Sequence, residues 1–391
     1  MKNIKDLDIK GKKVLIRVDF NVPLDKDGNV TSDSRILGAL PTINYALAEN
    51  AKLIICSHLG RPKGQRKEEF SLAPAAKRLS QLISREVKLA PDCIGKDVED
   101  MVAGMADGDV ILLENLRFYK EETENDPDFS RSLAALADVY VSDAFAVSHR
   151  AHASVVGVPG YLDQCAAGFL LQREIDFFHR AVKNPIRPLA AIIGGAKVSS
   201  KLAALRNLMN KVEIMIIGGA MANTFLKSQG MEIGKSLVEE DLLETASSLI
   251  EKAREKGVKL YLPVDFVAAE SFSDVAESKV VPVQEMPKDW MALDIGPATA
   301  TLFCEALDSA KTILWNGPMG AFEMKTFSRG TMTLVQKVAT SHALSIIGGG
   351  DTDAAVQMAG WADEISYMST GGGAFLTLME GKVLPGVAAL E

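Results

Sequence analysis

Short runs of apolar residues alternate with amphipathic stretches from one end of the chain to the other. The runs are rich in valine and isoleucine, which is typical of strands buried on both faces of a parallel sheet. They cover residues 14–18, 53–56, 110–113 and 139–141 in the first half, and 189–193, 214–217, 259–263, 312–315, 344–347 and 365–368 in the second. Helix-like segments lie between them, among others at residues 73–86, 241–256 and 352–360. This alternation predicts an α/β protein with two doubly wound, Rossmann-like parallel-sheet domains.

The length of the chain agrees with two domains. At 391 residues it is too long for one ordinary hydrophobic core, and domains of roughly 150–200 residues are expected. Residues 168–184 carry apolar side chains at a helical spacing, and Asn184-Pro185 breaks the pattern before the next strand. We predict a first domain at residues 1–167, an interdomain helix at 168–184 that supports a hinge, a second domain at 185–376 and a C-terminal return segment at 377–391.

Composition narrows the class of protein. Apolar residues make up 47% and charged residues 24%, as in a globular enzyme, and the formal charge of −8 argues against non-specific nucleic-acid binding. No apolar run approaches the roughly 20 residues that span a bilayer, and the first residues do not look like a signal peptide. The four cysteines (Cys56, Cys93, Cys165 and Cys304) are far apart in sequence, which argues against a zinc site or a disulfide framework. We therefore expect a cytoplasmic protein.

Polar and mostly cationic residues follow the predicted strands of the first half. Ligands of open α/β sheets bind beyond the carboxyl ends of the strands, so these positions are informative. They are Asp19 and Asn21 after the first strand, with Arg35 a little further on, then His58 and Arg61, then Arg117, and then Arg150 and His152. One arginine at a strand end is most often a solvated surface charge. A set of them suits a small polyanionic substrate, because guanidinium groups bind phosphate and carboxylate bidentately.

Glycines follow the predicted strands of the second half. They occur at Gly194-Gly195, Gly218-Gly219, Gly317, Gly348-Gly349-Gly350 and Gly371-Gly372-Gly373. Glycine also closes tight turns, so one such loop says little. Several in one domain favour a nucleotide site, because glycine lets the backbone approach a ligand and a following helix offers its first N–H groups to phosphate. No GxxxxGK[ST] motif occurs, so this is not a P-loop.

Three charged residues accompany the glycines. Lys197 and Lys201 are four residues apart, so at a helix start they share one face. The alternative is an exposed lysine pair, but their place directly after Gly194-Gly195 favours contact with phosphate. Asp351 is, at such a position, more often a helix N-cap, and it also suits a magnesium ion that is bound mainly by phosphate oxygens and water.

Taken together, the motifs resemble those of the phosphoglycerate kinase family over nearly the whole chain. In the first half they are Arg17-Val18-Asp19-Phe20-Asn21-Val22-Pro23, Ser57-His58-Leu59-Gly60-Arg61-Pro62, Glu114-Asn115-Leu116-Arg117-Phe118 and His149-Arg150-Ala151-His152. In the second half they are Gly194-Gly195-Ala196-Lys197-Val198, Trp315-Asn316-Gly317-Pro318, Gly349-Gly350-Asp351-Thr352 and residues 369–374. Each motif is moderately specific, and eight of them in this order are very specific.

The resemblance implies the site residues and the reaction. It implies a 3-phosphoglycerate site made by Asp19, Asn21, Arg35, His58, Arg61, Arg117 and Arg150. It implies an ADP/ATP site made by Gly195, Lys201, Gly219, Asn316, Glu323, Gly349, Gly350, Asp351 and Thr352, with Asp351 toward Mg²⁺. Arg35, Lys197 and Lys201, with the Gly372-Gly373 backbone, flank the phosphoryl group in transfer. The expected protein is a monomeric glycolytic phosphotransferase with small-molecule partners and no nucleic-acid or membrane partner.

Two positions depart from the family pattern. Ser200 stands where the family usually has aspartate, and Phe375 where it usually has serine. Ser200 bears on the orientation of the two lysines, and Phe375 on closure of the hinge. Two other interpretations are open. The first is a kinase for a different small acid on the same two-domain plan. The second, which only these two departures suggest, is a binding protein that keeps the pockets and has lost phosphoryl transfer.

Overall fold

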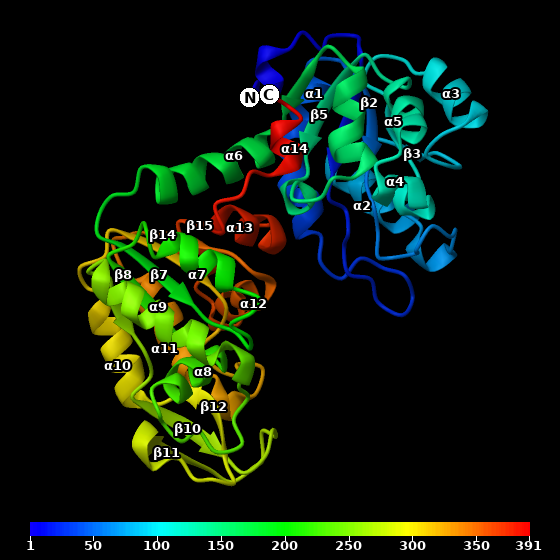
Figure 1. Ribbon diagram of the computed structural model, residues 1–391. Helices are drawn as coiled ribbons and strands as arrows, with labels where there is room; N and C mark the ends of the chain where they lie inside the picture. Colours follow the sequence, from blue (N-terminus) through cyan, green and yellow to red (C-terminus); the bar gives the residue numbers. More distant parts are fainter. The chain divides into compact units, whose positions relative to one another are not determined.

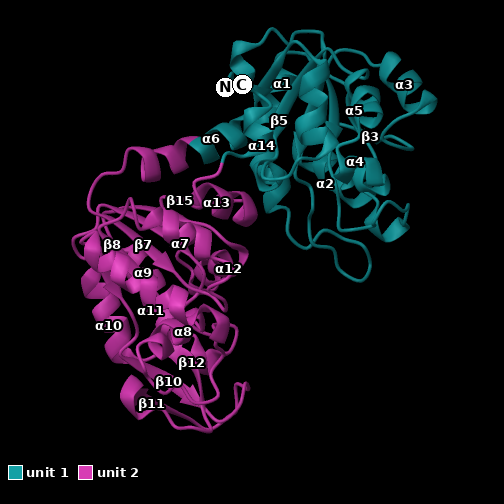
Figure 2. Ribbon diagram, in the orientation of Figure 1, with its two compact units in different colours: residues 1–175, 383–391 teal, residues 176–382 magenta.

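The computed structural model describes residues 1–391 and divides them into two compact units. Unit 1 contains Met1–Ile175 and Val383–Glu391, and unit 2 contains Asp176–Lys382 (Figure 2). The chain passes from one unit to the other twice. The first boundary, after Ile175, falls inside the predicted interdomain helix, and the second, after Lys382, falls inside the predicted return segment. The last residues of the chain therefore belong to unit 1, together with the N-terminus. The composition of the sequence had left this assignment open.

Unit 1, which contains the blue and cyan parts of the chain in Figure 1, is built on six parallel strands in the order β3-β4-β2-β1-β5-β6. The strands are β1 (Lys13–Val18), β2 (Lys52–Cys56), β3 (Val87–Leu89), β4 (Val110–Leu112), β5 (Val139–Asp143) and β6 (Cys165–Ala167). The helices are α1 (Ser34–Ala48), α2 (Ala73–Ile83), α3 (Lys96–Ala103), α4 (Lys120–Glu124), α5 (Pro127–Ala134) and α14 (Pro385–Ala388). Strand β1 lies between β2 and β5, so the chain leaves it first in one direction and later in the other. A reversal of this kind places a ligand site at the carboxyl end of β1.

Unit 2 has a second six-stranded parallel sheet, in the order β15-β14-β13-β7-β8-β9. Its strands are β7 (Leu189–Ile193), β8 (Ile214–Ile217), β9 (Lys259–Tyr261), β13 (Thr312–Asn316), β14 (Leu344–Ile347) and β15 (Tyr367–Met368). The helices are α7 (Leu202–Leu208), α8 (Met221–Ser228), α9 (Leu243–Glu255), α10 (Pro297–Ala306), α11 (Arg329–Ala339), α12 (Gly350–Ala359) and α13 (Gly372–Met379). Every residue of β7 is buried, as expected for a central strand. The strand order reverses between β7 and β13.

Unit 2 also carries a small antiparallel sheet that the apolar pattern did not predict. Its order is β11-β10-β12, and its strands are β10 (Asp265–Ala269), β11 (Ser278–Pro282) and β12 (Met291–Ile295). It has its own apolar cluster, in which Phe266, Val281 and Met286 are buried. The exposed edge strand β11 buries only one of its five residues, so its sequence gives no continuous apolar run.

Helix α6 (Phe169–Phe178) and the π-helical turn His179–Lys183 occupy the predicted interdomain segment. The N-terminus of α6 is bound within unit 1, where the carboxylate of Asp143 accepts the N–H of Leu171 and the hydroxyl of Thr42 accepts that of Phe169. Gly168 is required at this point, because a Cβ there would lie 2.3 Å from Asp143. None of the helices combines the length and the apolar character that crossing a membrane requires.

Candidate functional site

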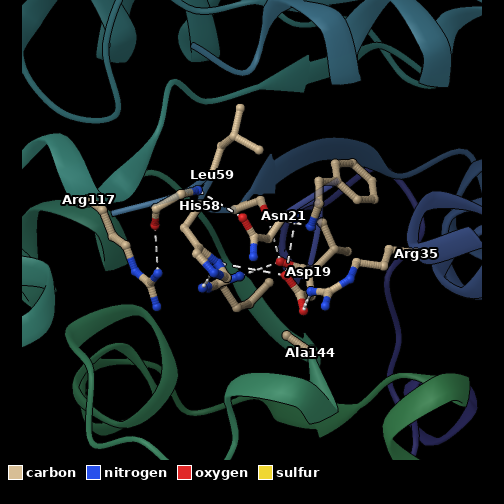
Figure 3. Close-up of polar contacts among 12 residues, drawn as sticks. Asp19, Asn21, Arg35, His58, Leu59, Arg117 and Ala144 are labelled. Carbon is tan, nitrogen blue, oxygen red and sulfur yellow. Dashed lines mark hydrogen bonds and ion pairs between the residues drawn. The ribbon is translucent and has the colours of Figure 1, made fainter. Parts of the chain in front are cut away.

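The carboxyl end of β1 holds an ion pair between Asp19 and Arg35. Asp19 is almost fully buried, and its Oδ2 accepts a hydrogen bond from the guanidinium of Arg35, which reaches it from α1 (Figure 3). The Arg35 side chain is 37% exposed, so part of its guanidinium faces solvent. A half-exposed cation that is fixed by a buried carboxylate is suited to binding an anionic group.

The loop after β2 is fixed by two of the predicted residues. Asn21 Oδ1 accepts the N–H of Gly60 at 2.8 Å, and Arg117 Nη1 donates to the carbonyl of the same residue at 2.8 Å (Figure 3). Burial, with the nearby charges of Arg17 and Arg150, lowers the pKa of Arg117 to about 10. Arg117 therefore stays charged at neutral pH, at a place where several positive charges lie close together.

His58 is buried and neutral. Burial, followed by the charges of Arg17, Arg117 and Arg35, holds the pKa of His58 well below its ordinary value. Arg17 Nη2 lies 3.2 Å from Nδ1 of His58, and a guanidinium can only donate. Nδ1 is therefore the acceptor, and the ring proton sits on Nε2. The contact of 3.8 Å between Nδ1 and Asp19 Oδ1 is accordingly not an ion pair.

Two of the predicted substrate residues make no polar contact with the rest of the set. Arg61 and Arg150 are both exposed, and the one hydrogen bond of Arg150 is made by its backbone N–H, which donates to the carbonyl of Val147. The charge of Arg150 nevertheless lowers the pKa of Arg117 and of His152, which places it near both residues. Burial and these positive neighbours lower the pKa of His152 to about 3.

Three buried residues behind this set were not predicted as site residues. Arg17 is fully buried inside β1, and its Nε donates to Ser154 Oγ at 2.8 Å. Ser154 in turn donates to the buried carboxylate of Glu122. The sequence did carry a signal for Arg17, because a charged residue within a predicted strand of buried apolar residues is unusual. Glu122 lies in the middle of the acidic helix α4, and nothing in its local sequence distinguishes it from its exposed neighbours.

Glycine backbones form the corresponding region of unit 2. The N–H of Gly195 donates to the carbonyl of Pro318, and the N–H of Gly219 to the carbonyl of Met319, each at 3.0 Å. Both glycines have positive φ, at +111° and +66°. A Cβ on Gly219 would lie 2.6 Å from the backbone of Gly195. The loops that follow β7, β8 and β13 can therefore meet only because these residues have no side chain.

A second group of predicted residues fixes the loop after β14. Asn316 Nδ2 donates to the carbonyl of Gly348 at 2.6 Å, and Thr352 Oγ1 accepts the N–H of Gly317 at 2.7 Å. Gly349 has a φ of +108°, and a Cβ on Gly372 would lie 3.1 Å from Gly349. The N-termini of α12 and α13 begin at these loops, and Gly350 and Gly373 are the exposed glycines there.

The structure corrects the interpretation of the two lysines. Lys201 is the N-cap of α7, which begins at Leu202, and Lys197 lies in the turn before it, so the two do not share a helix face. Lys197 is exposed. Burial lowers the pKa of Lys201 to about 8, against the opposing charge of Asp351. Only Lys201 is therefore partly withdrawn from water beside the acidic residue.

Asp351 is not a helix cap. The N-cap of α12 is Gly349, and no side chain caps this helix. Asp351 is exposed and lines a cavity of about 480 Å³ in unit 2, together with Gly195, Gly219 and Glu323. No group of three metal-ligating side chains occurs in the chain. A lone exposed carboxylate fits a Mg²⁺ ion that is bound mainly by nucleotide phosphates and water, and does not fit an all-protein metal site.

The other part of this cavity is apolar and was missed by sequence reasoning. It is lined by Leu237, Phe266, Phe272, Met291, Leu293 and Met319. Several of these residues belong to the small antiparallel sheet. An apolar wall with a few polar groups at one end is the usual character of a pocket for a base and its phosphates.

Asp294 lies at the same cavity and is buried. Its Oδ2 accepts the N–H of Gly330 at 2.7 Å, next to the start of α11, and its Oδ1 accepts the N–H of Ile295 at 2.9 Å. Burial raises the pKa of Asp294 to about 7, against these hydrogen bonds. This residue supports the wall of the pocket.

Comparisons with known proteins agree over the full length of the chain. The family model for phosphoglycerate kinase matches residues 4–382. A phosphoglycerate kinase of Desulfotalea psychrophila is 62% identical over 391 residues, covering 100% of both chains. One of Geobacter metallireducens is 62% identical and covers 98% of this chain and 96% of the relative. The chain belongs to the phosphoglycerate kinase family.

Solved structures of phosphoglycerate kinases have the same fold. The enzyme from Coxiella burnetii matches with a TM-score of 0.91 and 44% identity, over 99% of this chain and 98% of that one. The enzyme from Pyrococcus horikoshii matches with a TM-score of 0.83 and 31% identity, over 100% and 98%. The predicted family, the α/β fold with two parallel sheets and the assignment as a glycolytic phosphotransferase are confirmed. The roles of individual residues stay predictions.

Both departures from the phosphoglycerate kinase pattern have local contacts. Ser200 is exposed, and its hydroxyl donates to the carbonyl of Lys197 at 2.8 Å. Phe375 is buried in unit 2, with its ring edge-to-face with Phe178 at a centroid distance of 6.1 Å. A Cβ on Gly348 would lie 2.2 Å from the ring of Phe375, so this ring packs directly beneath the loop after β14.

Proposed function

We propose that the chain catalyses the reversible transfer of the acyl phosphoryl group of 1,3-bisphosphoglycerate to Mg-ADP, giving 3-phosphoglycerate and ATP. The observation that carries the proposal is the contrast between the two sheet ends of one chain. One presents charged side chains around Asp19 and Arg35, and the other presents a glycine backbone beside Lys201 and Asp351. The first arrangement suits a small polyanion and the second a nucleotide.

In unit 1, Arg35 supplies the cation nearest to the reacting carboxylate of 3-phosphoglycerate. Its guanidinium is oriented by Asp19, and the face that remains exposed is available to the substrate. Arg61, Arg117 and Arg150 bind the distant phosphate, and His58 donates its Nε2–H. Asn21 fixes the loop through Gly60.

In unit 2, the apolar wall binds the base, and the glycine loops bind the phosphates. Glu323, which is exposed at the cavity, reaches the ribose. Asn316 and Thr352 fix the loop whose N–H groups, at Gly349 and Gly350, contact phosphate oxygens. Asp351 would be the protein ligand of a Mg²⁺ ion bound with the nucleotide, and that ion would supply neutralisation of the phosphate charge.

The transfer needs no general base. In the ATP-consuming direction a carboxylate oxygen attacks the γ-phosphorus, and the bond to the β-phosphate oxygen breaks. A carboxylate with an ordinary pKa near 4 is already ionised at pH 7. Catalysis therefore consists of in-line alignment and of charge neutralisation by Arg35, Lys201 and Lys197, with the Gly372-Gly373 backbone donating to the group in transfer.

The two substrates are held by different units, so we infer a hinge-bending enzyme. The units must approach for transfer, and closure excludes the water that would hydrolyse the acyl phosphate. We also infer a monomer in a reducing cytoplasm. Support for the compartment comes from the cysteines, all four of which are free, with Cys56 and Cys93 buried.

The test is ATP-dependent conversion of 3-phosphoglycerate, coupled to glyceraldehyde-3-phosphate dehydrogenase and NADH. We expect turnover that requires magnesium and falls on the order of 10²-fold or more in Lys201→Ala, because a cation at the migrating charge is lost. Lys256→Ala, which removes an exposed lysine next to α9, is the matched control and should be unaffected. ATP binding without turnover would overturn the proposal. Turnover of another carboxylate, with none of 3-phosphoglycerate, would show that the chain is a kinase for a different acid.

A further inference from the structure

A buried pair of opposite charges lies behind the unit 1 site and has no role in the mechanism above. Arg17 and Glu122 are both fully buried, and they come from β1 and α4. They do not touch directly, because the hydroxyl of Ser154 lies between them. Two charges are costly to bury, so a pair of this kind calls for a specific structural reason.

Every hydrogen bond in this chain of residues has only one possible direction. Arg17 can only donate, so Ser154 Oγ accepts from Arg17 Nε at 2.8 Å. The hydroxyl proton of Ser154 is then given to Glu122 Oε1 at 2.7 Å. The backbone N–H of Ser154 donates to the other oxygen, Oε2, at 2.9 Å. Burial raises the pKa of Glu122, against the charge of Arg17 and the two hydrogen bonds from Ser154. In this geometry both carboxylate oxygens accept, which is the arrangement of an ionised Glu122.

The fixed hydrogen-bond directions extend through the Arg17 guanidinium to His58 in the proposed substrate site. Arg17 Nη1 donates to the carbonyl of Val18, and Arg17 Nη2 points at Nδ1 of His58. With its Nε and Nη2 held in this way, the guanidinium has one orientation. Nδ1 of His58 can then only accept, and the single proton of the neutral ring is on Nε2.

We propose that Glu122 and Ser154 are positioning residues that hold Arg17 so that His58 is fixed as a neutral Nε2–H donor to an anionic oxygen of the substrate. The inference rests on the proposed function of unit 1 as the 3-phosphoglycerate site. Neither residue touches the substrate. A wrong tautomer would present a lone pair to an anion and would weaken binding instead of strengthening it.

The surroundings of His58 keep the ring neutral over the working pH range. The charged and titratable groups that face it come from several elements: Arg17 and Asp19 at the end of β1, Arg35 on α1, Arg117 after β4, and His152 before Ser154. Most of these groups are cationic or neutral. Protonation of Nδ1 would also place a second donor against Arg17.

The first test uses the wild-type protein and ¹⁵N-detected NMR of its histidine rings, with His58→Gln to assign the signal. We expect His58 to show a protonated Nε2 and an unprotonated Nδ1, with no titration between pH 5.5 and 8. A Nδ1–H tautomer, or a ring that titrates in this range, would overturn the proposal whether or not the enzyme turns over 3-phosphoglycerate.

The second test separates positioning from general stability. In Ser154→Ala and Glu122→Gln, we expect a mixed tautomer signal and a rise in the Kd of 3-phosphoglycerate on the order of 10-fold, with the Kd of Mg-ATP unchanged. Glu124→Gln, an exposed neighbour on α4, is the matched control. Glu122→Gln leaves Arg17 without its counter-charge and is the variant more prone to misfold, so Ser154→Ala decides. A folded Ser154→Ala with an unchanged tautomer and Kd would refute the positioning role. Wild type that fails to bind 3-phosphoglycerate would instead refute the proposed function.

Discussion

The two parallel sheets of this chain end in binding sites of different construction. In unit 1, charged side chains are held by other side chains, as Arg35 is by Asp19 and Arg17 by Ser154. In unit 2, the main chain itself forms the surface, and positive φ at Gly195 and Gly219 lets three loops meet. Binding at a site made of charged side chains should be weakened by substitutions that remove charge. Binding at a site made of backbone should be weakened by substitutions that add volume.

The electrostatic consequences also differ. In unit 1, burial and the charges of Arg17 and Arg150 lower the pKa of Arg117, while the carboxylates of Glu122 and Asp19 oppose this shift. Unit 2 has one partly buried cation near its glycine loops, Lys201, and an exposed acid, Asp351. The excess of positive charge in unit 1 suits the polyanion that we propose binds there, and the lower positive charge of unit 2 suits a nucleotide that would bring a cation with it.

The strongest test of this contrast is Arg35→Ala. We expect kcat/KM for 3-phosphoglycerate to fall on the order of 10²–10³-fold, because the variant loses the cation at the reacting carboxylate and leaves Asp19 unpaired. The Kd of Mg-ATP should stay within about twofold, because the proposed nucleotide site is built from unit 2 alone. Steady-state kinetics and calorimetry measure the two quantities. Equal losses in both would mean that Arg35 acts through the stability of the whole protein.

The complementary test adds one methyl group to unit 2. Gly219→Ala places a Cβ 2.6 Å from the backbone of Gly195, and we expect the Kd of Mg-ATP to rise on the order of 10-fold or more while 3-phosphoglycerate binding is kept. Gly257→Ala is the matched control, because Gly257 has nearly the same φ, +69°, and open space around it. Both variants bear the strain of positive φ, and only the first has the clash. Equal nucleotide affinity in the two variants would show that the close approach of the loops does not determine nucleotide binding.

Sequence reasoning was most accurate where burial alone decides the structure. The residues of β7, β8 and β14 were predicted to the residue, because an interior parallel strand is a largely apolar run, interrupted here only by Ser345 of β14. The strand ends carrying Asp19 and Arg117 followed from the same rule. Glu122 could not be found in this way, because its partner Ser154 is 32 residues away and its neighbours on α4 are also acidic.

Two further errors have distinct causes. The apolar wall of the cavity was missed because β10 and β12 contain Asp265 and Asp294, and because the edge strand β11 is exposed, so none of the three gives a continuous apolar run. The shared face of Lys197 and Lys201 was wrong because the spacing was treated as helical. The residues between Gly194 and Leu202 form irregular turns instead of a helix. These turns bring Lys201 close to Gly195, and a Cβ built on Gly195 would lie 3.9 Å from Lys201 Cε.

The smallest effect on catalysis is expected at two buried acids that occupy similar places in the two units. Asp143 is the last residue of β5 and binds the start of α6, and Asp294, near the end of β12, binds the start of α11. Burial raises the pKa of each to about 7, from 3.8. A folded-state pKa above the unfolded value means that each acid adds stability when protonated, below about pH 4. This contribution is lost as the pH rises through 7.

The two acids should nevertheless respond differently to asparagine. Asp143 Oδ2 accepts no hydrogen bond, so Asp143→Asn keeps the bond to Leu171 and should flatten the loss of stability between about pH 4 and pH 7. Both oxygens of Asp294 accept N–H groups, so Asp294→Asn sets an amide N–H against a donor and should cost about 1–3 kcal/mol of unfolding free energy. All three tryptophans lie in unit 2, so their fluorescence follows that unit, while circular dichroism follows both. Asp143→Asn should therefore shift the unfolding transition of unit 1, which circular dichroism detects and tryptophan fluorescence does not. A shift of the fluorescence transition in this variant would show that the two units do not unfold independently.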